Sequence, residues 1–189
     1  MKKSLGAKTV LYPTPVLVVG TYDADGQANV MTAAWGGIAC SNPPCIAVSL
    51  RAATASHGNI MARNAFTISL PGEHNAAQAD YFGIVSGRDH DKFADLGMTA
   101  VRSDLVDAPY VAEFPIALEC KVVALNELGL HTQFIGEIVD VKADESVLSA
   151  DGAIDLELLK PILFAMGAQS YYGIGALIGK AYSIGKGIA

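Results

Sequence analysis

The chain has 189 residues, of which 51% are hydrophobic and 17% are charged, and its formal net charge is −6. The sequence contains no run of about 18 apolar residues, so no membrane span is predicted. It also contains no cluster of Lys and Arg, so a nucleic-acid partner is not expected. The length suits one domain over residues 1–189, and the mean hydropathy of +0.34 favours a homo-oligomer. Lys8, Pro13 and Pro15 interrupt the apolar start of the chain, so we expect a cytoplasmic protein without a signal peptide.

The first half of the chain carries three strand signals. Residues 13–35 predict a hairpin, because an apolar run meets Asp23-Ala24-Asp25-Gly26, where Gly26 can supply the positive φ of a turn. Residues 43–50 are a short apolar run behind a double proline, which is typical of a strand buried on both faces. Residues 65–71 alternate between apolar and polar and predict a further strand.

Helix signals lie between these strands and after them. Residues 54–64 predict a helix that Thr54 or Ser56 can cap, with Ile60 and Met61 on its apolar side. Two shorter helices, closed by Gly87 and Gly97, are expected over residues 75–87 and 89–97.

The second half of the chain predicts two long strands and a tail. One face of the strand at residues 116–125 is apolar at period two and holds Ile116, Leu118, Cys120, Val122 and Ala124. Residues 131–144 are apolar on both faces at their centre, which favours a position inside a sheet, and Gly136 marks a bend, a bulge or a close approach. Pro161 interrupts any helix over residues 154–167, and the glycine-rich tail at residues 171–189 is expected to lie extended on the body.

These signals together favour a mainly β protein with short helices. At least six strands with helices between them do not fit a βαβ alternation, so we predict a largely antiparallel barrel.

The spacing of the cysteines, the histidines and one glycine-rich segment argues against redox, metal and dinucleotide-binding sites. Apolar neighbours predict that the thiols of Cys40, Cys45 and Cys120 are buried, and a redox-active Cys40/Cys45 pair is the alternative. The four histidines show no metal-binding spacing, so no metal site is predicted. Residues 173–179 have the spacing G-x-G-x-x-x-G and are followed by too few residues for a dinucleotide-binding unit.

One set of residues suits a planar ligand that carries a phosphate. Ala33, Ala34, Gly36 and Gly37 are small enough for a flat ring to approach the backbone, and Trp35 offers a broad apolar face. Asn29 can donate and accept hydrogen bonds at once. Arg51, Thr54, Ser56 and Lys92 supply charge and hydroxyl groups, and the N-terminus of the helix at residue 54 can bind an anion. Each residue also has a simpler interpretation: Trp35 in the core, Asn29 at a turn, and Lys92 in solvent.

The order of the motifs resembles the flavin reductase-like family of FMN-binding split barrels. The matching motifs are P-x-P-V-x-V-V-G-T-x-D-x-D-G-x-x-N-x-M-T-A-A-W, S-N-P-P-C-I-A-V-S-L-R, H-D-K-F, A-P-Y-V, L-E-C-K-V, G-L-H-T-Q-F-I-G-E-I and Y-Y-G-I-G. They cover about residues 10–186. The resemblance implies a six-stranded antiparallel Greek-key split barrel, with FMN at the interface of a homodimer.

The resemblance also implies roles for individual residues. Residues 31–35, namely Met31, Thr32, Ala33, Ala34 and Trp35, run along the flavin ring, and backbone groups of Thr32, Ala33 and Ala34 bond to its polar atoms. Asn29 contacts the ring or the ribityl chain, while Ser49, Arg51 and Ser56 lie towards the ribityl chain and the phosphate. Lys92 pairs with the phosphate. His131 and Phe164 approach the flavin from the same subunit or from the second one.

Two functions follow from the resemblance. The first is an FMN-dependent oxidoreductase that accepts hydride from NAD(P)H, or electrons from a redox protein, and reduces a flavin or another redox protein. His131 would orient the substrate or stabilise the anionic reduced flavin. The alternative is a non-enzymatic FMN electron carrier, whose acidic charge would steer a basic redox partner. A barrel without a cofactor, serving as an interaction module, is the third interpretation.

Overall fold

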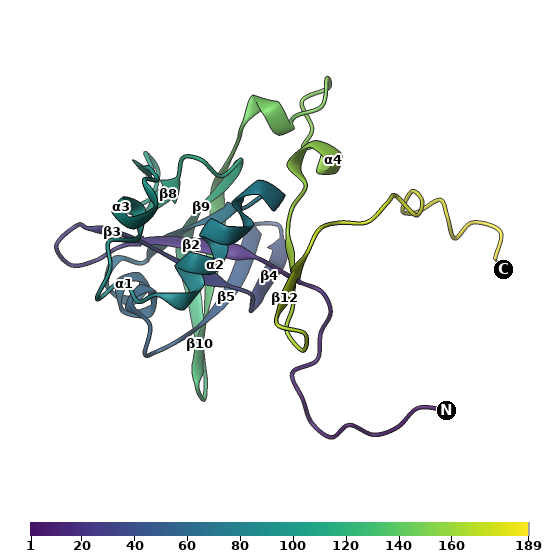
Figure 1. The fold of residues 1–189 in the computed structure, drawn as a ribbon, viewed down its shortest axis with the longest axis horizontal. Helices are drawn as coiled ribbons and strands as arrows, with labels where there is room; N and C mark the ends of the chain where they lie inside the picture. Colours follow the sequence, from purple (N-terminus) through teal and green to yellow (C-terminus); the bar gives the residue numbers. More distant parts are fainter. Residues whose placement is uncertain (189) are drawn as a thin grey trace.

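The computed structural model describes residues 1–188 and is dominated by one antiparallel sheet (Figure 1). Its strand order is β3-β2-β6-β9-β10-β5-β4, and two smaller sheets have the orders β1-β11-β12 and β7-β8. The elements are β1 (Thr14–Pro15), β2 (Leu17–Tyr22), β3 (Ala28–Ala33), β4 (Gly36–Ser41), β5 (Pro44–Arg51), α1 (Ala55–Arg63), β6 (Ala65–Leu70), η1 (Glu73–Asn75), α2 (Ala76–Ile84), α3 (Lys92–Leu96), β7 (Ala100–Arg102), β8 (Pro109–Val111), β9 (Ile116–Leu128), β10 (His131–Ala143), η2 (Glu145–Val147), α4 (Leu156–Leu159), β11 (Leu163–Ala165) and β12 (Ser170–Tyr172).

The predicted fold class is confirmed. The protein is mainly β, its strands pair antiparallel, and short helices lie between them. Six strands (β3, β2, β6, β9, β10 and β5) are neighbours in that order in the main sheet, and β4 extends the sheet beyond β5. The predicted strand at residues 43–50 is β5, which lies inside the sheet between β10 and β4.

Two apolar clusters lie on opposite faces of β2. Because side chains alternate along a strand, Leu17 and Val19 enter one cluster, while Val16 and Val18 enter the other. The second cluster is covered by α2 and α3, which pack on β3 and contribute Phe82 (Figure 1). This cover places the end of α2 beside β3, and that junction forms part of the candidate site described below.

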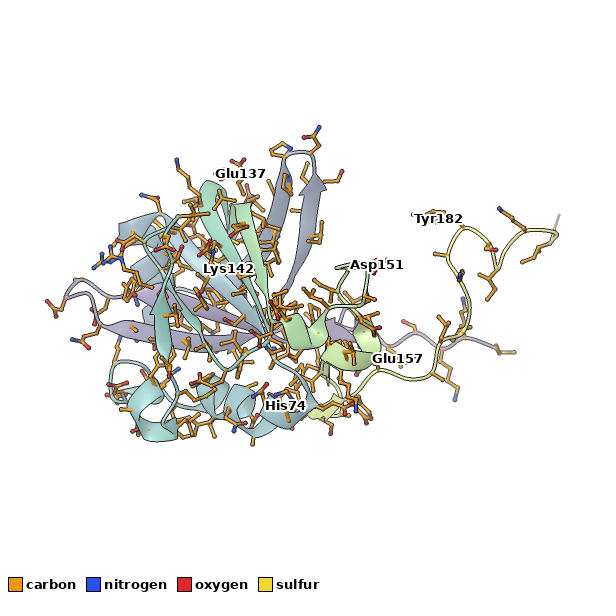
Figure 2. All side chains as sticks on the ribbon, turned by 90° about the horizontal axis from the view of Figure 1, so that it is seen from above. His74, Glu137, Lys142, Asp151, Glu157 and Tyr182 are labelled. Atoms are coloured by element: carbon orange, nitrogen blue, oxygen red, sulfur yellow. The ribbon has the colours of Figure 1, made fainter. Side chains whose placement is uncertain are left out.

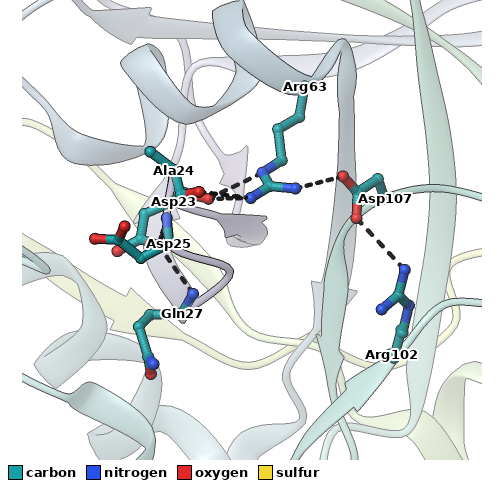
Figure 3. A network of polar contacts seen from close by, with 7 residues as sticks. All are labelled: Asp23, Ala24, Asp25, Gln27, Arg63, Arg102 and Asp107. Atoms are coloured by element: carbon teal, nitrogen blue, oxygen red, sulfur yellow. Dashed lines mark hydrogen bonds and ion pairs between the residues drawn. The ribbon is translucent and has the colours of Figure 1, made fainter.

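The predicted hairpin at residues 13–35 is the β2–β3 pair, and its turn is held by a polar network (Figure 3). Gly26 has a φ of 82°, and the Asp23 carboxylate accepts hydrogen bonds from the backbone of Asp25 and Gln27, both at 2.9 Å. Arg63, the last residue of α1, donates through Nε to the Asp23 carbonyl at 2.9 Å. The Arg63 guanidinium also pairs with Asp107 at 2.6 Å, so the network ties α1 to the turn and to the loop before β8.

Helix α1 begins where the sequence predicts it. Thr54 is the cap, since its Oγ1 accepts a hydrogen bond from the His57 amide at 3.3 Å. Ser56 lies inside the first turn and is buried, as is Ile60. Met61 is 45% exposed, so its expected place on the apolar side of the helix is wrong; Ile60 alone occupies that side at this turn.

The shorter helices agree with the sequence in part. Gly97 closes α3 in the left-handed conformation with a φ of 61°, as predicted. Gly87 does not close α2, because the helix ends at Ile84 and the next residue, Val85, is already extended. Gly87 is needed for a different reason, which is its close approach to Asn29. Pro161 follows α4, which stops at Leu159.

Strands β9 and β10 form the longest pair of the sheet, and Gly136 lies at an irregular point in it. The register shifts between Ile135 and Gly136, so both the bulge and the close approach predicted for this glycine are present. A methyl group at position 136 would lie 2.5 Å from Cζ of Phe66, which is fully buried on β6. The glycine therefore makes room for an aromatic ring of the core.

We expect Gly136→Ala to lower the free energy of unfolding by about 1–3 kcal/mol, because the new methyl group must displace the buried Phe66 ring. Urea unfolding followed by circular dichroism measures the change. Gly37→Ala is the matched control, since the space around Gly37 on β4 is open and this glycine has no positive φ. Equal stability of the two variants would contradict the packing role of Gly136.

The prediction of three buried thiols is wrong for one of them. Cys45 and Cys120 are buried, whereas Cys40 is exposed because it lies on the edge strand β4. Cys40 and Cys45 lie directly opposite each other in the β4–β5 pair. Burial and the neighbouring Cys40 raise the pKa of the Cys45 thiol. The redox role of the pair stays a prediction.

The glycine-rich tail does not lie on the body, so that prediction is wrong. Residues 170–172 form β12, but residues 175–188 are exposed throughout and leave the body (Figures 1 and 2). Residue 189 lies outside the described residues. Within residues 1–188, no helix is both long and apolar enough for a membrane span.

Candidate functional site

A wide cavity of about 500 Å³ opens at the end of β3. Strands β3, β5 and β10 and the connection from β3 to β4 supply one part of its wall, and α2 with the β11–β12 hairpin supplies the other. It collects nine of the residues predicted to bind a flavin: Met31, Thr32, Ala33, Ala34, Trp35, Ser49, Arg51, His131 and Phe164. Its walls are more apolar than polar, as a ring-shaped ligand requires.

A narrow cavity of about 240 Å³ adjoins the wide one. The two share Met31, Thr54, Gly83 and Ile84, so they form one continuous depression. The narrow cavity contains the remaining three predicted residues: Asn29, Ser56 and Lys92. The structure therefore brings all twelve predicted site residues together in one place, from segments spread over residues 29–164.

Asn29 carries an acceptor that has no partner. The side chain is 8% exposed, and its Nδ2 donates a hydrogen bond to Ser56 Oγ at 2.9 Å. Its Oδ1 is buried and makes no hydrogen bond within the chain. A buried oxygen of this kind costs free energy unless a donor reaches it, so the geometry is suited to a ligand with a hydroxyl or N–H group.

Gly87 lets the Asn29 amide take this position. A Cβ at residue 87 would lie only 1.9 Å from Asn29 Oδ1. The sequence pointed to Gly87 as a helix terminator and missed this role, because nothing in the pattern of residues shows that the chain returns to β3 at this point.

Lys92 lies at the base of the narrow cavity rather than in solvent. It is 3% exposed, and its Nζ donates to the carbonyl oxygens of Val30 at 2.7 Å and Phe82 at 2.8 Å. Among the residues that the structure describes, no acidic side chain pairs with it. Burial lowers the pKa of Lys92 from 10.5 to about 8. A buried ammonium without a counter-ion attracts an anion.

The N-terminus of α1 faces the same cavity. Thr54, Ala55 and Ser56 all line it, and the first amide groups of a helix have no partner inside the helix. Their partial positive charge adds to that of Lys92. Helix start, buried hydroxyl and buried ammonium together fit the predicted phosphate site.

Trp35 is 44% exposed at the mouth of the wide cavity, so it is not a core residue. Its carbonyl accepts a hydrogen bond from the Ser49 amide at 2.8 Å, which joins it to β5. The ring of His131 lies 5.9 Å from that of Trp35, centre to centre, with the two planes tilted by 41°. His131 is also paired with Arg51 across β10 and β5. These three side chains therefore belong to the same end of the cavity.

The sequence reasoning missed three polar residues of the wide cavity: Asp80, Gln169 and Tyr171. The Tyr171 hydroxyl donates to Asp80 Oδ1 at 2.9 Å, which joins β12 to α2 across the cavity. Burial and then this hydrogen bond raise the pKa of Tyr171 to about 12. Gln169 has a φ of 48°, which is unusual for a residue other than glycine. No local motif marks any of the three, because their segment joins the site only through tertiary packing.

Residues 9–170 match the family described as the flavin reductase like domain. The chain belongs to this family. Flavoredoxin of Desulfovibrio vulgaris (Miyazaki F) is 55% identical, with a TM-score of 0.93 and coverage of 98% of this chain and 100% of that one. Flavoredoxin from Methanosarcina acetivorans is 28% identical, with a TM-score of 0.91 and coverage of 98% of both chains. The fold of the flavin reductase-like chain is thus the split barrel that its motifs implied.

Curated relatives match the flavin reductase-like chain over shorter stretches. The reductase component of a 4-nitrophenol 4-monooxygenase/4-nitrocatechol 2-monooxygenase from Rhodococcus opacus is 33% identical over 104 residues, which are 55% of this chain and 52% of that protein. A protein of Aeropyrum pernix is 31% identical over 157 residues, which are 82% of this chain and 58% of that protein. This chain therefore spans less than two thirds of either relative.

Proposed function

We propose that this flavin reductase-like protein binds FMN across the two cavities and passes electrons from NAD(P)H or a redox protein to a flavin or a second redox protein. The observation that carries the proposal is the unpartnered Asn29 Oδ1. Asn29 lines the narrow cavity together with the N-terminus of α1, and this cavity adjoins the apolar wide cavity. A ligand with a flat ring, a hydroxylated chain and a terminal phosphate matches these three parts in order.

The ring belongs in the wide cavity under this proposal. Backbone groups of Thr32, Ala33 and Ala34 face its polar edge, and Trp35 covers part of one face. Ring burial contributes about 25 cal/mol per Å² of apolar surface, and an aromatic contact adds about 0.5–1.5 kcal/mol. Met31, Ser49, Arg51 and Phe164 complete the wall around it.

The chain and the phosphate belong in the narrow cavity. Asn29 Oδ1 needs a donor, which a ribityl hydroxyl supplies and a phosphate dianion does not. The phosphate is then left to the groups that carry positive charge or donate hydrogen bonds, namely Ser56, the start of α1 and Lys92.

FMN, when bound, supplies the ring that accepts and releases electrons. The protein supplies position and charge. His131 lies beside Trp35 at the open end of the wide cavity, where it can orient a substrate or offset negative charge on a reduced ring. This chemistry needs no pair of carboxylates acting as acid and base.

The test of the donor is a stopped-flow experiment on the FMN-loaded protein. We expect NADH or NADPH to bleach the visible absorption of the bound flavin rapidly. A protein that takes up no FMN on titration would contradict the proposal as a whole.

The second candidate function is an electron carrier that serves another redox protein. The acidic net charge of −6 favours it, because such a surface steers a basic partner. Bound FMN that is bleached by neither nucleotide, but is reduced by a basic redox protein at low ionic strength, would establish this candidate instead.

We expect Trp35→Ala to weaken FMN binding by about 0.5–1.5 kcal/mol, because it removes an aromatic wall of the wide cavity. The free energy of unfolding should change by less than about 1 kcal/mol, since the side chain is 44% exposed. Fluorescence titration and urea unfolding measure the two effects. Trp35→Phe is the control and should keep most of the affinity. A loss of stability at unchanged affinity would return Trp35 to a structural role.

We further propose that the protein is a cytoplasmic homodimer. The high mean hydropathy of +0.34 supports a second copy.

A further inference from the structure

The β4–β5 hairpin carries two cysteines that face each other across the strands (Figure 1). Cys40 on β4 and Cys45 on β5 are directly opposite in the antiparallel register, and residues 41–44 join them. Directly opposite residues have Cα atoms about 4.5–5.5 Å apart and side chains on the same face of the sheet. A disulfide needs Cα atoms about 4.4–6.8 Å apart, so the hairpin backbone already has the spacing of a Cys40–Cys45 disulfide.

The third cysteine cannot take the place of either partner. Cys120 is fully buried on β9, and β10 lies between β9 and β5 in the main sheet. Two strand spacings put the backbones at Cys120 and Cys45 roughly 9–10 Å apart. This separation is beyond the limit of about 7 Å for the Cα atoms of a disulfide. Burial, followed by Glu119 and Cys45, also raises the pKa of Cys120 to about 12, so this residue stays a thiol.

The two thiols of the hairpin differ in their access to solvent. Cys40 is exposed on the edge strand, and its Sγ makes only a weak contact of 3.4 Å with the Asn42 carbonyl. Cys45 is 5% exposed and lies opposite Glu137 of β10. Burial, followed by Cys40 and Glu137, raises the pKa of the Cys45 thiol. Because the thiolate is the reactive form, an external molecule meets a reactive group at Cys40 and not at Cys45.

The cysteine pair is separate from the cavities of the proposed function. Neither Cys40 nor Cys45 lines the wide or the narrow cavity. Cys40 follows Trp35 by five residues, which corresponds to about 16 Å along an extended strand. The spacing C-x-x-x-x-C in the sequence does not reveal the pair, because only the register of β4 on β5 brings the two residues together.

We propose that Cys40 and Cys45 form a second redox centre, which is independent of the flavin and exchanges electrons with disulfides of low molecular mass. This inference goes beyond the proposed function, since it uses neither cavity. An exposed thiol that starts the exchange and a protected thiol directly opposite it are the two parts that such a centre needs.

The reaction is a pair of thiol–disulfide exchanges. The Cys40 thiolate attacks one sulfur of the external disulfide, so a mixed disulfide forms and one external thiolate leaves. Cys45 gives its proton to that thiolate, and its sulfur then attacks Cys40 Sγ. The Cys40–Cys45 bond forms, the mixed disulfide breaks, and the second external thiolate takes up the proton that Cys40 released. The two cysteines together lose two electrons and two protons, and the external disulfide becomes two thiols.

The first experiment counts thiols in the full chain as purified. The protein is reduced, freed of reductant and incubated without denaturant in mixtures of reduced glutathione and glutathione disulfide. Acid stops the exchange, and mass spectrometry after alkylation in denaturant counts the free thiols. We expect the count to fall from three to one as the oxidised fraction rises, and to return to three with excess reduced glutathione.

Three outcomes of this experiment would overturn the proposal. The first is a count of three at every mixture. The second is a glutathione adduct that stays on Cys40 while Cys45 remains a free thiol. The third is a bond between the Cys40 residues of two chains, which non-reducing electrophoresis shows as a doubled mass.

Single variants test the order of the two steps. Cys45→Ala removes the second thiol, so glutathione should stay attached to Cys40. Cys40→Ser removes the exposed thiol, so the remaining thiols should react about tenfold more slowly or less. Cys120→Ala is the matched control and should form the Cys40–Cys45 disulfide like wild type. Fast loss of thiols in Cys40→Ser, or no disulfide in Cys120→Ala of native circular dichroism, would contradict the assigned pair.

FMN titration of the same samples separates this inference from the proposed function. Protein that binds FMN but forms no Cys40–Cys45 disulfide contradicts the second redox centre alone. Protein that forms the disulfide but binds no FMN contradicts the proposed function alone.

Discussion

Lys92→Met is expected to weaken FMN binding by about 1.5–3 kcal/mol, because the variant loses a charge-assisted hydrogen bond to the phosphate. Methionine fills much of the space of the lysine stem, so the narrow cavity keeps its shape. The Val30 and Phe82 carbonyls lose their donor as well, so stability should also fall. Quenching of FMN fluorescence on titration gives the dissociation constant.

Riboflavin, which lacks the phosphate, is the control ligand for Lys92→Met. Its affinity should be nearly the same in wild type and variant, and the preference of wild type for FMN over riboflavin should largely disappear. An equal loss for both ligands would mean that Lys92 acts by holding β3 and α2 in place rather than by binding phosphate.

The affinity for FMN should also depend on pH through Lys92. The pKa of this group in the ligand-free protein is about 8, and bound phosphate favours the charged form, so affinity should fall as pH rises above 8. The unfolded chain, with an ordinary lysine pKa of 10.5, binds more protons between these values, so Lys92 makes the free energy of unfolding rise with pH across that window. The affinity for riboflavin should not fall in this way above pH 8. The Lys92→Met variant should lack both the pH dependence of FMN affinity and this contribution to the pH dependence of the free energy of unfolding.

Gly87→Ala is expected to weaken FMN binding by about 1–3 kcal/mol without unfolding the protein. The new methyl group would lie 1.9 Å from Asn29 Oδ1, so the amide must rotate and leave its bond to Ser56. The ligand then loses an acceptor that folding had placed for it. Isothermal titration calorimetry with FMN measures the loss.

Two further variants serve as comparisons for the FMN affinity of Gly87→Ala. Gly175→Ala, in open space and outside both cavities, should bind FMN like wild type. Asn29→Ala removes the amide itself and should reproduce most of the loss seen in Gly87→Ala. Normal affinity in Gly87→Ala together with weak binding in Asn29→Ala would show that the amide tolerates a methyl group beside it.

Much of the fold was accessible from local signals. Gly26 and its aspartates predict the hairpin, Thr54 predicts the start of α1, and Gly136 predicts the bulge of the long strand pair. Each of these is a property of a few neighbouring residues, where backbone preferences and side-chain periodicity decide the outcome.

The candidate site could be predicted from the motifs of the family, and only in part from the residues themselves. Small residues around Trp35 suggest a flat ligand, but neither the unpartnered Asn29 Oδ1 nor the contact with Gly87 follows from the sequence, since β3 and residue 87 meet only through packing. The same holds for the Asp80–Tyr171 bond. The position predicted for the C-terminal tail was wrong, because the local sequence pattern indicates that a segment is extended but not which surface it packs on.

The Arg63 network has a consequence for recognition at the opposite end of its helix. A nine-residue helix is about 14 Å long and stiff, so fixing its last residue to the hairpin turn also fixes the direction of its first amides. The part of the narrow cavity formed by the start of α1 is thereby in place once the protein has folded. Little further ordering of the chain is needed when a ligand binds there. Under the proposed function, selectivity for a phosphorylated ligand thus depends on Arg63, an arginine that lies outside both cavities.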